Sequence, residues 1–383
     1  MKKLTLALGL AVIATPALAS KARLEALGED NFGSYYINDN RNQFLNPARI
    51  NEAKDLVTYE FGSSSTGSAV VADSAAAPKA EGGFNKAWNN MVWGLHFGNS
   101  TPSATVVRGL AGADLQERNV WDLFVGGDSG IKWGANLTYE GYSKSDSNAG
   151  TNKLTSNSLR ARVGVISGDL DAFAQVSLKG DANDYSGNNV EGKSSYFLGA
   201  GYMMNSYKLF ADYLHVGTEY EVGGAGSNDW KTDRIRLGAA RQERLNDKTN
   251  LFAKLMAVHS KVENDGATSA TAGISGKTTN ITLPIVVGLE YDAASWLALR
   301  ASVVQNVYGN NKVDPKAGSK SSGTIANTAV NAGASLKFGE LTVDGLISTD
   351  ANGDGANAAN TSGGNGTLRT DALMSRVSMT YRF

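Results

Sequence analysis

Apolar and polar residues alternate at every second position along much of this chain. Between residues 131 and 142, for example, Ile131, Trp133 and Leu137 fall on one face of an extended strand, while polar or small residues fall on the other. Residues 281–291 repeat the pattern. Because successive side chains of a β-strand point to opposite faces, a period of two predicts strands that each have one apolar and one polar face.

Sixteen such segments, separated by clusters of turn residues, are the predicted strands. They span residues 56–62, 90–98, 103–110, 118–127, 130–142, 156–167, 169–180, 193–204, 207–217, 232–243, 247–262, 278–291, 295–308, 325–338, 340–349 and 371–383. The segment 103–110 alternates least, and it is included because the direction of the chain requires another strand before residue 118.

The connections between these segments alternate between short and long. Turns such as GGDSG and FGE have few residues, whereas the stretches 143–155, 181–192 and 350–370 are long and rich in Gly, Asn, Ser and Asp. A barrel in a bacterial outer membrane has short periplasmic turns and longer external loops. The chain therefore predicts an all-β fold, a transmembrane antiparallel up-and-down β-barrel of sixteen strands over residues 56–383.

The N-terminus predicts export. Residues 1–19 contain two lysines, a mostly apolar run and then Ala17-Leu18-Ala19, which is typical of a cleaved secretory signal peptide. No other stretch is apolar for roughly 18 residues, which excludes membrane-spanning helices. The chain has no cysteine, so disulfides and thiol chemistry are excluded. Without Lys2 and Lys3, 34 of the 36 basic residues remain against 37 acidic ones, a net charge of −3 that argues against nucleic acid as a partner.

The chain ends on Tyr381-Arg382-Phe383. An alternating strand with a terminal aromatic residue resembles the C-terminal signature of bacterial outer-membrane barrels, which implies that Phe383 and Tyr381 are an assembly signal for the barrel-assembly machinery. Strand number, length and loop pattern resemble the general porins. That resemblance implies an outer-membrane location, contact with lipid and lipopolysaccharide, and a homotrimer. The loop GYSKSDSNAGTNKLTS departs from the porin pattern because it lacks a Pro-Glu-Phe-Gly-Gly motif.

Residues 20–55 precede the first predicted strand and include Asn46, Pro47 and Ala48. This layout resembles the outer-membrane long-chain fatty-acid transporters, in which an Asn-Pro-Ala element belongs to a hatch inside the barrel. Those barrels resemble a fourteen-stranded plan, so fourteen strands is the alternative count. Two interpretations of residues 20–55 remain open: a periplasmic arm with a proline-set turn, or a plug inside the barrel.

If the apolar positions face lipid, the alternate positions line the interior. Charged residues there require water or opposite charges. The arginines among them either form a basic ladder that filters solutes by charge, or pair with carboxylates and brace the wall. The predicted pore-lining residues are Arg160, Arg162, Arg234, Arg236, Arg300, Arg376, Lys132, Lys254 and Asp344.

Two short patterns suggest nucleotide or metal binding. Residues 187–194, GNNVEGKS, fit the phosphate-binding pattern G-x-x-x-x-G-K-S, but they lead into a predicted strand instead of opening a helix. Asp350, Asn352 and Asp354 match the start of a calcium loop whose twelfth position is Thr361 and not Glu. We therefore predict no cofactor and no nucleotide, with the three loop residues as a candidate for weak calcium binding only.

The histidines limit the scope for catalysis. Only His96, His215 and His259 are present. His215 and His259 fall on lipid-facing positions, and His96 points inward without a partner that the sequence identifies. Hydrolytic barrels need a histidine held beside a nucleophile, so we predict that the protein is not an enzyme.

The predicted function is that of an outer-membrane porin, a passive diffusion channel for small polar solutes and ions through a water-filled, arginine-lined lumen. Two alternatives remain. One is a plugged outer-membrane transporter for hydrophobic ligands, with residues 20–55 as its hatch. The other is a structural or surface-recognition barrel whose long loops matter more than its lumen.

Overall fold

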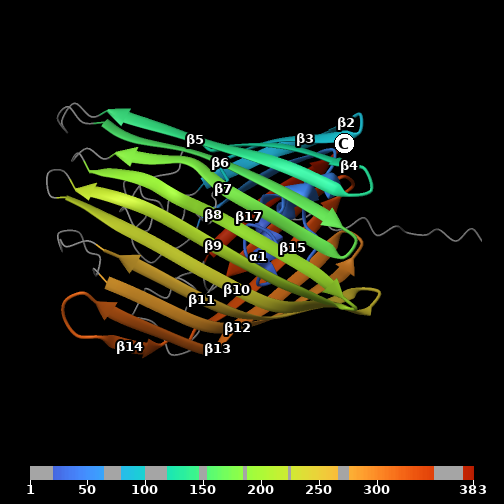
Figure 1. Ribbon diagram of the computed structural model, residues 1–383. Coiled ribbons are helices and arrows are strands. Elements are labelled where there is room, and N and C mark those ends of the chain that lie inside the picture. Colours follow the sequence, from blue (N-terminus) through green and yellow to red (C-terminus); the bar gives the residue numbers. More distant parts are fainter. Residues whose placement is uncertain are drawn as a thin grey trace, which may run out of the picture.

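The computed structural model describes residues 20–63, 79–99, 119–145, 153–183, 188–222, 226–265, 276–348 and 374–383. Its strands form one antiparallel sheet that closes on itself (Figure 1). Closure occurs at β1 (Leu56–Ser63), which pairs with β2 (Lys79–Trp88) on one side and with β17 (Met374–Arg382) on the other.

The remaining strands follow in chain order around the wall. They are β3 (Met91–Phe97), β4 (Trp121–Asp128), β5 (Lys132–Ser145), β6 (Lys153–Ser167), β7 (Leu170–Asn183), β8 (Asn189–Met204), β9 (Tyr207–Val222), β10 (Gly226–Asn246), β11 (Thr249–Asn264), β12 (Gly276–Ala294), β13 (Leu297–Pro315), β15 (Thr328–Phe338) and β16 (Leu341–Ser348). The short β14 (Ser321–Thr324) pairs with the far end of β13, which itself pairs directly with β15. Sixteen strands therefore close the wall, as predicted, and the fourteen-strand alternative is wrong.

The two faces of the wall differ in polarity. On β12, the side chains of Ile281, Val287 and Leu289 are exposed on the outer face, whereas Thr282 and Glu290 are buried inside the barrel. An apolar exterior around a polar interior is the architecture of an outer-membrane β-barrel, because the band of side chains that meets lipid must be apolar. Exposed aromatic side chains form a girdle near the short turns, as expected at a lipid interface: Tyr202, Tyr207, Tyr291, Trp296 and Phe338.

One strand lies where the sequence predicted a loop. β2 falls between the predicted strands 56–62 and 90–98, and it pairs with both β1 and β3. The predicted strand 103–110 lies outside the described residues, and β3 pairs directly with β4, so the wall has no position for a strand between them. The predicted total is right, but the strand that completes it is β2. Gly82 and Gly83 dilute the alternation of β2, which explains why the pattern missed it.

Several strands run beyond their predicted ends on the side of the long loops. β10 begins at Gly226 where the pattern predicted residue 232, and β13 continues to Pro315 where it predicted residue 308. These extensions are mostly polar, as expected of strand ends that stand above the lipid. Apolar alternation therefore detects only the part of each strand that meets lipid.

The last strand agrees with its predicted orientation. Met379, Tyr381 and Phe383 are exposed on the outside, and Ser378 and Thr380 are buried inside. The backbone N–H of the terminal residue donates a hydrogen bond of 3.1 Å to the carbonyl oxygen of residue 55, just before β1. The chain can end on this strand because the pairing of β17 with β1 leaves no free edge.

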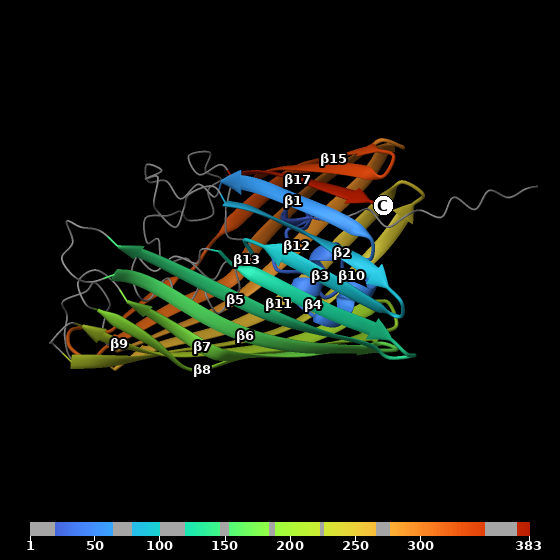
Figure 2. The ribbon, with the colours of Figure 1, turned by 90° about the horizontal axis from the view of Figure 1, so that it is seen from above.

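Residues 20–55, which we call the inner segment, lie inside the barrel in the half nearer the short turns (Figures 1 and 2). They form α1 (Lys21–Ala26), η1 (Asn40–Phe44) and η2 (Pro47–Glu52). α1 packs against β13, β15, β16 and β17, while η2 packs against β3 to β6 on another part of the wall. Within the described residues, no helix is long and apolar enough to cross a membrane. The predicted signal peptide, residues 1–19, lies outside the described residues.

Candidate functional site in the barrel lumen

The short helices of the inner segment each begin at a capping side chain. Ser20, Asp39 and Asn46 accept hydrogen bonds from backbone N–H groups two or three residues further on, at the starts of α1, η1 and η2. Such caps satisfy amide groups that a helix leaves unpaired at its first turn. They explain how a segment without sequence periodicity holds a defined shape.

Residues 46–48, the Asn-Pro-Ala element, dock into a recess of the wall. The side-chain amide of Asn46 donates a hydrogen bond of 2.5 Å to the carboxylate of Asp171. Wall glycines provide the space: a Cβ at Gly164 would lie 1.7 Å from the side-chain oxygen of Asn46, and one at Gly134 would lie 2.3 Å from the carbonyl oxygen of the proline. The wall therefore fits this element closely.

A chain of buried charges joins α1 to β12, β13 and β16. The guanidinium of Arg23 donates to both carboxylate oxygens of Glu290, at 3.0 and 3.2 Å. Arg300 donates to Glu290 at 2.5 Å and to Asp344 at 2.8 Å, and the Ser20 hydroxyl donates to the other oxygen of Asp344 at 3.1 Å. The wall residues predicted from sequence, Arg300 and Asp344, are thus paired with each other and linked to the inner segment.

A second group of charges lies where the barrel closes. The Lys21 ammonium pairs with the carboxylate of Glu81 on β2, and Arg41 donates to the second oxygen of that carboxylate at 2.8 Å. On β17, the guanidinium of Arg376 lies 3.0 Å from the carboxylate of Glu25. The predicted Arg376 therefore faces the inner segment as well.

A third group surrounds η2. Arg49 pairs with Asp171 on β7, with Nε 3.1 Å from the carboxylate, and with Glu52 at 2.8 Å. The predicted Lys132 on β5 reaches the other oxygen of Glu52 at 2.9 Å. Buried charges are stable only when opposite charges and hydrogen bonds surround them, so these groups couple the position of the inner segment to the wall.

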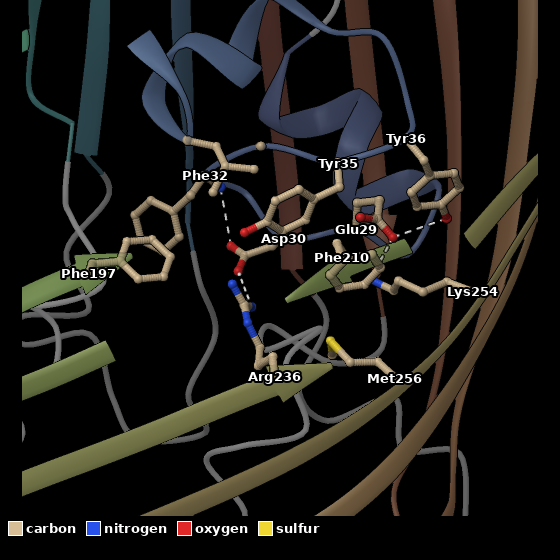
Figure 3. Close-up of a pocket in the computed structure, with 12 residues that line it drawn as sticks. Glu29, Asp30, Phe32, Tyr35, Tyr36, Phe197, Phe210, Arg236, Lys254 and Met256 are labelled. Atoms are coloured by element: carbon tan, nitrogen blue, oxygen red, sulfur yellow. Dashed lines mark hydrogen bonds and ion pairs between the residues drawn. The ribbon is translucent and has the colours of Figure 1, made fainter. Parts of the chain in front are cut away.

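A fourth group contains two more of the predicted residues and borders a cavity (Figure 3). Arg236 on β10 lies 3.3 Å from Asp30 of the inner segment and 2.9 Å from Asp212 on β9. Lys254 on β11 lies 2.6 Å from Glu29 of the inner segment. Each of the two wall cations is thus held by a carboxylate of the inner segment at the rim of the same cavity.

The rest of this cavity is apolar. With the inner segment in place its volume is only about 20 Å³, and it is lined by Tyr35, Leu45, Phe197, Phe210 and Met256, among others. The Tyr35 ring stacks on Phe210 with centroids 4.7 Å apart. Its lining, an aromatic and aliphatic body with two cations at the rim, is complementary to an amphipathic molecule with a negative head, and such a molecule fits only after the inner segment moves.

Three of the predicted residues remain, and all three lie on strands of the wall. The Arg160 guanidinium is 3.6 Å from the Glu140 carboxylate, and Arg162 donates to the side-chain oxygen of Gln175 at 3.0 Å. Arg234 is half-buried on β10. The sequence left two alternatives for these arginines, a basic ladder and a braced wall. The ion pair and the hydrogen bond described here brace the wall.

Sequence reasoning missed the partners that the inner segment supplies. Glu25, Glu29 and Asp30 lie on a stretch whose sequence shows neither strand nor helix periodicity. The sequence therefore did not predict that these side chains contact the wall. His96 on β3, for which the sequence named no partner, lies 2.9 Å from the side-chain oxygen of Asn85. The Asn-Pro-Ala element was the local signal that the sequence reasoning used, and the capping residues Ser20 and Asp39 are signals that it missed.

Burial shifts the pKa values of charged groups on the inner segment. It raises the pKa of Asp39 to about 7, against the opposing effect of the Arg23 guanidinium. It also raises the pKa of Glu25 and lowers that of Lys21, although Glu81 opposes the latter shift. For Glu52, the raising effect of burial is outweighed by Arg49, and its pKa is lowered.

Of the two short patterns, only the phosphate-binding one extends into the described residues. The described part of the G-x-x-x-x-G-K-S pattern, residues 188–194, leads into strand β8 of the wall and opens no helix. Asp350, Asn352 and Asp354 lie outside the described residues. Among the residues that are described, no group of three or more His, Cys, Asp or Glu side chains could hold a metal ion.

No family model and no curated protein matches the chain. Solved structures with a similar course include a bacterial polysaccharide outer membrane secretin (TM-score 0.43, 10% identity, 86% of this chain and 98% of that one). A Pseudomonas aeruginosa FadL homologue (0.37, 12%, 95% and 98%) and a Rh. blastica porin mutant (0.30, 11%, 86% and 99%) are similar too. At such scores the likenesses carry no argument about function, and the fold rests on the strand pairing itself.

Proposed function

We propose that the protein is an outer-membrane transporter for small anionic amphipathic molecules, with the inner segment as a plug that leaves its closed position when a ligand binds. The proposal combines an apolar exterior, which fits a lipid bilayer, with a lumen that contains a folded segment and an amphipathic cavity.

One observation carries the proposal. The two cations at the rim of the cavity, Arg236 and Lys254, belong to the wall, and each is bound by a carboxylate of the inner segment, Asp30 or Glu29. A ligand carboxylate or phosphate that enters the cavity meets the same cations. Ligand binding and closure by the inner segment therefore compete for the same two charges.

This competition provides a mechanism for opening. A ligand head that takes Arg236 or Lys254 leaves Asp30 or Glu29 without its cation in a buried place, which costs several kcal/mol unless water reaches the carboxylate. Displacement of the inner segment hydrates that carboxylate. Water can replace the ion pairs between segment and wall, whereas the apolar contacts, such as Phe44 and Ile50 against Phe124, oppose the separation.

The Asn-Pro-Ala element supports this proposal over a periplasmic arm. Residues 46–48 resemble the hatch element of long-chain fatty-acid transporters, and in this chain they dock against β5, β6 and β7 inside the lumen. The outer-membrane location and the assembly role of Tyr381 and Phe383 are part of the proposal. A homotrimer is a further expectation from the porin resemblance.

Ligand binding tests the proposal. We expect the purified protein to bind a fluorescent long-chain fatty acid in competition with an unlabelled one. Arg236→Gln and Lys254→Gln should each weaken binding about 10- to 100-fold, because a charge-assisted hydrogen bond contributes about 1.5–3 kcal/mol. Arg160→Gln is the matched control, since Arg160 pairs with Glu140 on the wall. Equal affinity in all four proteins would exclude this cavity as the ligand site.

The passive diffusion channel remains the second candidate. The observation that favours it is the charged wall outside the inner segment, where Arg160 and Arg162 face the interior. A porin shows stable ohmic conductance without any ligand. Steady conductance that does not change when fatty acid is added would support this candidate over the plugged transporter.

A further inference from the structure

A polar patch interrupts the apolar exterior on β8, β9 and β10, on the side of the long loops. Cross-strand pairing places Tyr196, His215 and Asp233 side by side in one row across the three strands. The neighbouring row toward the short turns is Leu198, Tyr213 and Ile235, which is largely apolar. The edge of the apolar band therefore runs between these two rows, and the polar row lies at the outer lipid interface.

Three side chains of this patch form a hydrogen-bonded chain. The Ser194 hydroxyl lies 3.3 Å from Nε2 of His215, and Nδ1 of His215 lies 2.8 Å from the carboxylate of Asp233. Because a carboxylate only accepts, Nδ1 carries a proton and donates to Asp233, which leaves Nε2 of the neutral imidazole to accept from the serine. This is the order of a nucleophile, a general base and an orienting acid.

Other contacts hold the histidine and the carboxylate in place. The Tyr213 hydroxyl donates a hydrogen bond of 2.6 Å to Asp233, and the Tyr196 ring stacks on the imidazole with centroids 5.0 Å apart. The side chains of His215 and Asp233 are partly exposed, at 16% and 30%. The hydrogen-bonded side chains are thus held in a fixed orientation, and a molecule in the surrounding membrane can still reach them.

The serine sits on an irregularity of the wall. Register shifts between Gly192 and Ser195 on β8, so that residues 193 and 194 together face Gly217 of β9. A bulge of this kind turns a side chain out of the regular ladder, and such bulges occur beside active sites.

We propose that Ser194, His215 and Asp233 form a serine-hydrolase site on the outer wall that cleaves carboxylic esters of membrane lipids. Ser194 Oγ bonds to the ester carbonyl carbon while its proton passes to His215 Nε2. The C–O bond to the alcohol then breaks, and His215 returns the proton to the departing oxygen. Water, deprotonated by His215, releases the acyl group from Ser194 as a carboxylic acid.

The position of the site selects the substrate class. The ester groups of a membrane lipid lie where its acyl chains end and its polar head begins. The polar row stands at that level, and an acyl chain bound to Ser194 could lie along Leu198 and Ile235, whose side chains are exposed on the outer wall. The substrate is therefore an amphipathic ester with its chain in the bilayer, which a lumen site could not reach.

The inference is independent of the proposed transport and departs from the prediction that the protein is not an enzyme. Ser194 is the last residue of the G-x-x-x-x-G-K-S pattern, and the sequence placed His215 among interfacial side chains. The three residues come from different strands, 21 and 18 positions apart. Only the pairing of those strands brings them together.

Active-site labelling tests the inference directly. The detergent-solubilised full-length protein should react with a biotin-tagged fluorophosphonate, with the label mapped to Ser194 by mass spectrometry. It should also release decanoate from didecanoylphosphatidylcholine in mixed micelles. We expect Ser194→Ala to abolish labelling, and Ser194→Ala and His215→Ala each to slow ester cleavage at least about 10³-fold.

Matched variants keep the test independent of folding. Ser195→Ala changes the neighbouring serine of the same strand, and His259→Ala changes a histidine in the next row, paired with Ile235. Both should keep labelling and turnover, and all variants should keep the heat-dependent gel mobility of a folded barrel. Wild-type turnover no higher than that of Ser194→Ala, or a label that remains on the Ser194→Ala protein, would overturn the inference.

Discussion

At the scale of single residues, the lumen depends on buried charges that are shared between wall and inner segment. Glu290 lies between two guanidinium groups, Arg300 from the wall and Arg23 from the inner segment. Removal of one member of such a group leaves an uncompensated buried charge, which typically costs about 3–5 kcal/mol. These residues therefore fix where the inner segment sits.

Asp39 gives the inner segment a pH dependence. Burial raises the pKa of this carboxyl to about 7, so the folded protein holds the proton more tightly than an unfolded chain, where the pKa is near 3.8. The resulting stabilisation is complete below about pH 4 and is lost as the pH rises through about 7. Glu25, whose pKa is also raised by burial, acts in the same direction, and Lys21 acts in the opposite one.

We therefore expect the inner segment to loosen between about pH 5 and about pH 8. A cysteine at position 27, in a chain with no cysteine of its own, should react at least about tenfold faster with a water-soluble maleimide at the higher pH, relative to the same protein unfolded at each pH. Asp39→Asn keeps the helix cap and removes the titrating group. The same pH profile in both proteins would show that Asp39 is not the sensor.

For single residues, the sequence predicts which face of a strand a side chain lies on better than it predicts which residue that side chain contacts. The period of two places Arg300, Arg236 and Asp344 on the face away from the lipid, because orientation follows from strand geometry alone, and in the structure all three side chains are buried. Their partners depend on strands and segments far away in the chain. Asp30, which binds Arg236, lies 206 positions from it, and no local pattern encodes that contact.

At the scale of elements, the wall is shaped to receive η2. Gly134 and Gly164 face the Asn-Pro-Ala element, where a larger residue would collide with its backbone or with Asn46. A glycine inside a strand usually weakens it, and here the close approach of another backbone explains the residue.

Gly164→Ala should displace the element without opening the barrel. The new Cβ would lie 1.7 Å from the Asn46 side-chain oxygen, which forces residues 46–48 away from β6. A cysteine introduced at position 48 should then react with a water-soluble maleimide at least about tenfold faster, which corresponds to about 1.4 kcal/mol of weaker docking.

Gly345→Ala is the control for this variant. Gly345 lies on β16, and a Cβ there would meet no atom within 4 Å, so the reactivity of position 48 should stay unchanged. Equal reactivity in the Gly164→Ala and Gly345→Ala proteins would mean that the recess at β6 does not hold the Asn-Pro-Ala element.

The elements differ in how far the sequence reveals them. Strands such as β12 are evident because lipid requires an apolar side chain at every second position. β2 was missed because glycines at positions 82 and 83 supply no apolar signal, although pairing with β1 and β3 keeps it in the wall. The inner segment has no period, since it meets both polar and apolar parts of the wall on several sides. The sequence therefore left two alternatives for it, a periplasmic arm and a plug.

At the scale of the whole molecule, the barrel presents two surfaces with different chemistry. The lumen contains the inner segment and a cavity with two cations, and the outer wall contains a serine, a histidine and an aspartate at the lipid interface. The wall keeps them apart, so a change on one surface need not alter the other. Transport and ester cleavage can therefore be measured separately.

A covalent tether between the inner segment and the wall tests the central claim most directly. A Cβ at Gly288 on β12 would lie 3.5 Å from the Cα of Leu27, so cysteines at these two positions are within reach of a disulfide. The protein without cysteines and the single variant Leu27→Cys control for the oxidant and for the loss of the leucine.

The measurement is the planar-bilayer conductance of Leu27→Cys/Gly288→Cys in the presence of dodecanoate, before and after reduction of the disulfide. If passage requires the inner segment to leave its place, the reduced protein will show ligand-dependent conducting steps and the oxidised protein will be silent. Conducting steps of the same size and frequency in both states would contradict the account.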